Sequence, residues 1–94
     1  MKIGLLQIEL YLSQCGSLKQ KRMILNGLKS KLRDKFNISI IEADYQDKWQ
    51  RSVLAVACIS NNEKIVDSTF NQILNFIDVE KKGFEILNSQ IEML

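Results

Sequence analysis

Apolar residues recur in this chain in two patterns, one typical of strands and the other typical of helices. The order of these patterns limits the folds that the chain can adopt. Residues 2–12 alternate between apolar and polar side chains, which is the period of a half-buried strand. Over residues 18–36, apolar side chains recur at steps of three and four, as in an amphipathic helix. Two strand-like runs, residues 38–46 and 51–60, then precede a second helical period and a last strand-like run. The sequence therefore predicts the order β-α-β-β-α-β.

The first predicted helix has recognisable ends. Ser17, followed by Gln20 three residues later, forms a capping-box pattern in which each side chain satisfies a free backbone N–H. Asn37 is a suitable left-handed stop after Phe36. Gly27 lies inside the helix, where glycine is less favourable than alanine by about 1 kcal/mol, so we expect another part of the chain to pack closely there.

The second half of the chain repeats these signals. Ser60 and Glu63 form another capping-box pattern, and the helical period that follows runs to about Asp78. The letters EKKG at residues 80–83 predict a turn, and residues 84–94 predict a fourth strand.

The third predicted strand is apolar on both faces, which places it in the centre of a sheet. Its two faces carry Leu54, Val56 and Cys58 on one side and Val53, Ala55, Ala57 and Ile59 on the other. With right-handed crossovers, the predicted fold is α+β and ferredoxin-like: one domain over residues 1–94, with a four-stranded antiparallel sheet and both helices on one face. The helices leave the alanine-lined face uncovered, so we expect a homodimer, in which a second copy packs on that face or pairs at the edge of the sheet. The alternative is an apolar strip that faces solvent between longer side chains.

Composition excludes several kinds of site. The chain has no histidine, which excludes imidazole catalysis and His-ligated zinc, and its net charge of +2 does not by itself indicate a nucleic-acid partner. Cys15 and Cys58 lie outside any CxxC motif and no secretory segment is recognisable, so we expect a reduced, cytoplasmic setting. No apolar stretch approaches the ~20 residues that span a bilayer, and no membrane partner is expected.

Positive charge is concentrated in the first helix. Residues 17–35 contain seven cations and one acid, whereas residues 61–94 contain three cations and six acids. Cations on one flank of a helix suit a phosphate backbone, because each contact that displaces a counterion adds salt-dependent affinity. The candidate phosphate contacts are Lys19, Lys21, Arg22, Lys29 and Arg33. The alternative is an ordinary solvated flank whose long side chains cover apolar surface.

The stretch EADYQDKWQR, residues 42–51, joins the two middle strands through a short connection at DKW. The candidate ligands for a hard cation are Glu42, Asp44 and Asp47, but their spacing fits no established metal loop. Lys48 and Arg51 are available to pair with these acids. Trp49 predicts either a ring folded onto the sheet or an anchor at an interface. The candidate interface residues are Tyr45, Gln46, Asp47, Trp49, Gln50 and Arg51.

Three motifs in this sequence resemble those of the YlxP-like family of small bacterial proteins. They are S-L-K-x-K-R, R-x-x-F-N-x-S and D-x-Q-D-x-W-Q-R, and the resemblance weakens after about residue 79. It implies a ferredoxin-like fold and a small cytosolic protein, with genes near those of translation initiation and ribosome maturation factors, but no established activity, cofactor or catalytic residue. The sequence departs from the family at Tyr45, where histidine is usual. The matching positions are Ser17, Leu18, Lys19, Lys21, Arg22, Phe36, Asn37, Asp44, Gln46, Asp47, Trp49, Gln50 and Arg51.

The predicted function is that of a non-enzymatic accessory protein that binds RNA or a ribosomal assembly through its basic helix, without a cofactor or catalytic residues. Two alternatives stay open at this point. One is a small-molecule or metal-binding enzyme with its site at Asp44 and Asp47, and the other is a protein–protein interaction module that uses the hairpin.

Overall fold

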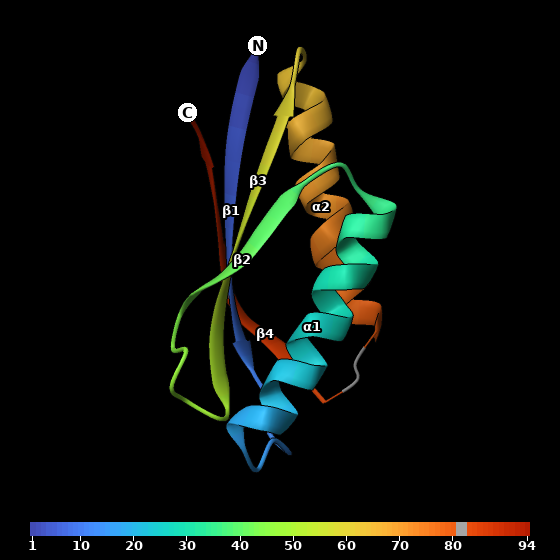
Figure 1. Ribbon diagram of the computed structural model, residues 1–94. Coiled ribbons are helices and arrows are strands. Elements are labelled where there is room, and N and C mark those ends of the chain that lie inside the picture. Colours follow the sequence, from blue (N-terminus) through green and yellow to red (C-terminus); the bar gives the residue numbers. More distant parts are fainter. Residues whose placement is uncertain (81–82) are drawn as a thin grey trace.

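The computed structural model, which describes residues 1–80 and 83–94, has the predicted order of elements (Figure 1). The elements are β1 (Lys2–Tyr11), α1 (Leu18–Lys35), β2 (Ser39–Asp44), β3 (Arg51–Ser60), α2 (Glu63–Glu80) and β4 (Glu85–Met93). The strands form one antiparallel sheet in the order β2-β3-β1-β4, and both helices lie on the same face of it (Figure 1). The ferredoxin-like α+β prediction is therefore confirmed. The predicted turn at residues 80–83 falls partly on Lys81 and Lys82, which lie outside the described residues.

The two central strands are β1 and β3, as the apolar faces of β3 predict. They pair along their whole length, from Lys2 opposite Ser60 to Tyr11 opposite Arg51. The even-numbered residues from Gly4 to Leu10 of β1 and from Ser52 to Cys58 of β3 point toward the helices and are buried, while odd-numbered residues point to the open face. Every described helix falls short of the length and apolar character needed to cross a bilayer.

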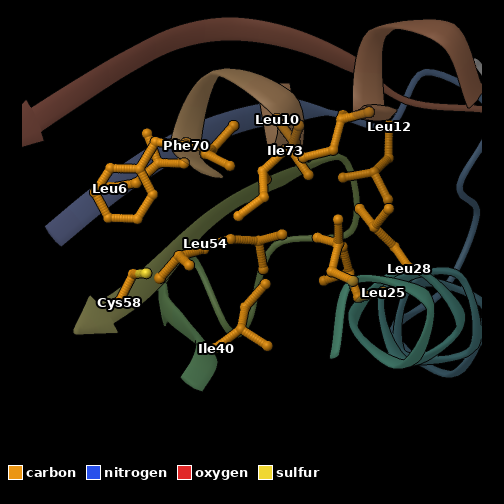
Figure 2. Close-up of a cluster of buried hydrophobic side chains, with 14 of the residues drawn as sticks. Leu6, Leu10, Leu12, Leu25, Leu28, Ile40, Leu54, Cys58, Phe70 and Ile73 are labelled. Atoms are coloured by element: carbon orange, nitrogen blue, oxygen red, sulfur yellow. The ribbon is translucent and has the colours of Figure 1, made fainter. Parts of the chain in front are cut away.

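The core lies between the helices and the sheet. Figure 2 shows Leu6 and Leu10 of β1 meeting Phe70 and Ile73 of α2. Leu25 and Leu28 of α1 pack at the other end of the cluster, toward Leu12 (Figure 2). Cys58 of β3 also belongs to this core, since it is 6% exposed and lies beside Leu54 (Figure 2).

The observed helix caps agree only in part with the capping boxes predicted from the sequence. Ser17 caps α1 and accepts a hydrogen bond from the Gln20 N–H at 3.1 Å, as predicted. The Gln20 side chain, however, accepts from the N–H of Gly16 at 2.7 Å, one residue earlier than the box pattern requires. At α2 the predicted Ser60 cap is wrong, because Asn62 Oδ1 accepts from the Lys64 N–H at 2.9 Å. Ser60 instead accepts from the Asn62 N–H and orders the residue that caps the helix.

The predicted left-handed stop of α1 is also wrong. The helix ends at Lys35 because Phe36 leaves it in an extended conformation, with φ −130° and ψ 145°, while its N–H still donates to Leu32. Among the described residues other than glycine, only Tyr45 has a positive φ, of 61°. The aromatic ring of Phe36 packs against the core, and this anchor replaces a left-handed residue as the device that turns the chain.

Gly27 is exposed, and a Cβ atom built there would meet nothing within 4 Å, so the expectation of close packing is wrong. We therefore expect Gly27→Ala to raise the free energy of unfolding by about 0.5–1 kcal/mol, since alanine restricts the unfolded chain without a clash. Urea denaturation measures this change. Gly83→Ala is the matched control with the opposite sign, because the φ of +84° at that position disfavours a side chain. A loss of stability in Gly27→Ala would show that the position needs glycine after all.

Candidate functional site

Four of the predicted phosphate-contacting residues lie together on one flank of α1. Lys19, Arg22 and Arg33 are exposed and Lys29 is half-buried. At about 100° per residue, the four fall within an arc of about 80° and span about 21 Å along the helix. None has a carboxylate partner within 4.0 Å among residues 1–80 and 83–94. We call Lys19, Arg22, Lys29 and Arg33 the α1 basic stripe.

The α1 basic stripe borders β2, which forms one edge of the sheet (Figure 1). Arg33 Nη2 donates a hydrogen bond to the carbonyl oxygen of Ile40 at 3.1 Å. This contact ties one end of the stripe to the edge strand and leaves the positive charge of the guanidinium without an acid beside it.

Lys21 does not belong to this surface, which corrects the prediction that it contacts phosphate. Its side chain is 1% exposed, and its Nζ lies 2.8 Å from Glu42 Oε2. It also donates to the carbonyl oxygen of Tyr45 at 2.5 Å, and Ser52 donates to the same Glu42 oxygen at 2.7 Å. A buried ammonium that is held by protein oxygens has no access to a phosphate. Lys21 instead fastens α1 to the end of β2.

The connection between β2 and β3 covers residues 45–50 and is longer than the predicted three-residue turn. Tyr45 occupies the left-handed region, its N–H donates to Asp44 Oδ1 at 2.7 Å, and its carbonyl accepts from the Lys48 N–H at 3.0 Å. Gln50 fixes the other side of the connection, because its carbonyl accepts from Leu12 and its side chain donates to the Ser13 carbonyl. We call residues 45–50 the hairpin connection, and its backbone is held on both sides.

Trp49 lies on this connection, and about half of its side chain is open to solvent, with 53% of it exposed. Arg51 does not pair with the acids of the hairpin connection, as the sequence suggested, but with Glu9 of β1. The guanidinium also lies 5.3 Å from the centre of the Tyr45 ring. The hydrogen bond that the Arg51 guanidinium donates to the Glu9 carboxylate raises the pKa of Arg51 above its usual value.

The remaining hairpin candidates lie at the surface. Gln46 donates to the Glu42 carbonyl, and Asp47 is exposed. Of the acids considered as cation ligands, Glu42 pairs with Lys21 instead, and Asp44 is exposed. Within the part of the chain that the structure describes, no three His, Cys, Asp or Glu side chains are placed to share a metal ion.

Comparison with known proteins places this arrangement in a family. Residues 3–91 match the family described as "Protein of unknown function (DUF503)". The chain belongs to the DUF503 family. A curated relative, "Uncharacterized protein YlxP" of Bacillus subtilis (strain 168), is 37% identical over 76 residues, which cover 81% of this chain and 83% of the relative. The resemblance drawn from the three sequence motifs is thereby confirmed.

The motif residues that connect this chain to the DUF503 family divide into two groups. Ser17, Lys21 and Gln50 make hydrogen bonds that cap α1 or hold the hairpin connection, so the fold accounts for them. Lys19, Arg22 and Trp49 are exposed, and their side chains make no hydrogen bond or ion pair with another described residue. The fold does not account for these side chains, nor for those of Asn37 and Asp47, which are exposed in the same way.

The buried polar cluster of this DUF503 protein was not predicted, although two signals point to it. Lys21 precedes Leu25 by four residues and Leu28 by seven, which places it on the apolar side of α1. Ser52 shares the core face of β3 with Leu54 and Val56. A lysine and a serine on apolar faces both need polar partners when buried, and Glu42 supplies the partner for both.

Proposed function

We propose that this protein binds RNA through the α1 basic stripe. The observation that carries the proposal is that some cations of α1 pair with acids and others do not. Lys21 and Lys31 pair with Glu42 and Glu80, whereas the stripe cations have no acid partner within the described residues. Cations left in this way keep their full attraction for an anionic partner.

The shape of the stripe favours a polymer over a single anion. Its members recur along about 21 Å of helix, which is too long for one phosphate group and suits a backbone that repeats its charge. Each stripe residue that neutralises a phosphate releases a counterion, so binding is a sum of several salt-sensitive contacts. The position of related genes beside those for translation factors supports RNA as the polymer.

A salt titration tests the proposal. A labelled RNA hairpin is titrated with the protein at 50 and 200 mM NaCl, and fluorescence anisotropy gives the affinity. If all four stripe residues contact phosphates, affinity falls about 50- to 150-fold between these concentrations. With Arg22→Ala and Lys29→Ala combined, the fall shrinks to about 7- to 12-fold, because two contacts remain.

The matched control removes the same charge elsewhere. Lys2 and Lys64 are exposed, and they belong to β1 and α2 rather than to α1. Combining Lys2→Ala with Lys64→Ala leaves the salt dependence of the wild type. Equal salt dependence in the two double variants, or no binding by the wild type, would contradict the proposal.

A further inference from the structure

The face of the sheet opposite the helices carries an apolar hollow. It has a volume of about 200 Å³ and is lined by Leu5, Ser39, Ile40, Ile41, Ala55 and Ala57. The two alanines of β3 create the space because their side chains are short. Ile41 is 62% exposed at the rim, and Ile59, farther along the same face of β3, is 54% exposed.

The hairpin connection lies on the same side of the molecule as this hollow. In Figure 1 it swings away from the helices at the lower end of the sheet, and Trp49 is part of it. One side of the chain therefore presents both a large exposed ring and an apolar hollow. A tryptophan side chain is the kind of group that anchors an interface when it fills such a space.

The ring is presented by a rigid segment. Backbone and side-chain hydrogen bonds hold both sides of the connection. Tyr45 has a left-handed φ of 61°, and its backbone is fixed by hydrogen bonds with the Lys21 and Asp44 side chains. A non-glycine residue in this conformation costs about 1–3 kcal/mol and persists only where its surroundings fix it. A group held in advance loses little freedom when it binds.

We propose that a second copy of this chain covers the open face, with Trp49 of each protomer inserted into the hollow of the other. The surface is self-complementary, since one chain carries both the ring and the space for it. Exchange of the two across a two-fold axis closes the assembly at a dimer.

The charge beside Trp49 and the charge beside the hollow are opposite in sign. Lys48 lies next to Trp49, is exposed and has no carboxylate partner in the described part of the chain. Glu92 of β4 is exposed on the open face, directly opposite Leu5 of the hollow in the register of β1 and β4. Insertion of the ring brings the ammonium of one protomer toward the carboxylate of the other.

The open face of the sheet is by itself too small for a stable dimer interface, so the hairpin connection has to take part. The four strands have 10, 6, 10 and 9 residues, and at a rise of about 3.3 Å per residue and a spacing of about 4.8 Å they give a flat face of about 550 Å². A stable interface takes about 800 Å² from each partner, so the open face has to be used together with the projecting connection.

Contact through the β2 edge of the sheet is less suitable. The outward carbonyl of Ile40 on β2 already accepts from Arg33, and the carbonyl of Tyr45 just beyond β2 accepts from Lys21. Side chains of α1 therefore occupy the edge where another strand would have to pair. This favours packing between open faces.

Sedimentation equilibrium without RNA tests the proposal. We expect the wild type to be a dimer at micromolar concentration. Trp49→Ala and Ala57→Arg, which remove the ring and fill the hollow, each raise the dissociation constant at least about 30-fold, as expected at an interface hot spot. Ile65→Ala is the control: it removes a similarly exposed apolar side chain from α2, on the other side of the sheet, and leaves the constant unchanged.

Fluorescence of the only tryptophan gives a second measurement. On dilution of the wild type, emission shifts to the red as the ring returns to water, whereas Ala57→Arg emits at the red position at every concentration. Circular dichroism checks that both variants are folded. A wild type that is monomeric at 100 µM, or a dimer whose dissociation constant neither variant changes, would overturn the proposal.

Discussion

We expect Glu42→Ala to lower the free energy of unfolding by about 3–5 kcal/mol, the range found when a buried ion pair loses one partner. Lys21 is 1% exposed, so removal of Glu42 leaves its ammonium buried with only the Tyr45 carbonyl as a partner. Ser52 loses its acceptor at the same time. Urea denaturation at neutral pH measures the loss.

Two further variants separate the ion pair from general disruption of the site. Lys21→Met alone has a smaller effect, because Glu42 is 19% exposed and keeps its hydrogen bond from Ser52. Lys21→Met combined with Glu42→Leu restores most of the stability, since apolar side chains of similar volume often replace a buried pair without loss. A loss below about 1 kcal/mol in Glu42→Ala would mean that Lys21 reaches water when its partner is gone.

The second large effect is expected at Gly4, where β1 passes beneath α2. A Cβ atom there would lie 2.5 Å from Val66 Cγ1 and 2.7 Å from Phe70 Cε2. Both neighbours are fully buried and have no solvent to move into. Gly4→Ala should therefore destabilise the protein by about 3 kcal/mol, at the upper end of the usual effect of overpacking. Thermal denaturation gives the change.

A rescue variant and a control make this test specific. Val66→Ala removes the closest atom, so its combination with Gly4→Ala should be more stable than the sum of the two single effects predicts. Gly16→Ala is the control, because a Cβ there would come no closer than 3.7 Å to the Gln20 side chain. If Gly4→Ala were as stable as the wild type, the contact between β1 and α2 would be looser than the structure has it.

The order of elements could be predicted because it follows from local periods. The two apolar faces of β3 place it beside β1 in the centre, and the spacing of Lys19, Arg22, Lys29 and Arg33 fixes them on one flank through helix geometry alone. These features depend on neighbours in sequence, and they agree with the structure.

The features that were missed depend on partners distant in the chain. Glu42 meets Lys21 from the end of β2, and Glu80 meets Lys31 from the end of α2, so a count of charges in α1 overstates its free positive charge. The cap of α2 is a competition between nearby polar residues, which loop geometry decides in favour of Asn62. The exposure of Trp49 depends on how far the hairpin connection extends from the sheet, which composition does not encode.

The two buried thiols of this small protein can report on local opening of its structure. Cys15 is 2% exposed before α1, where its thiol donates to the Ser17 carbonyl, and Cys58 lies on β3 near Phe70 (Figure 2). A thiol reagent reaches each sulfur only when the surrounding segment opens. The alkylation rates of the two cysteines therefore report separately on the loop before α1 and on the contact of β3 with α2, without any introduced label.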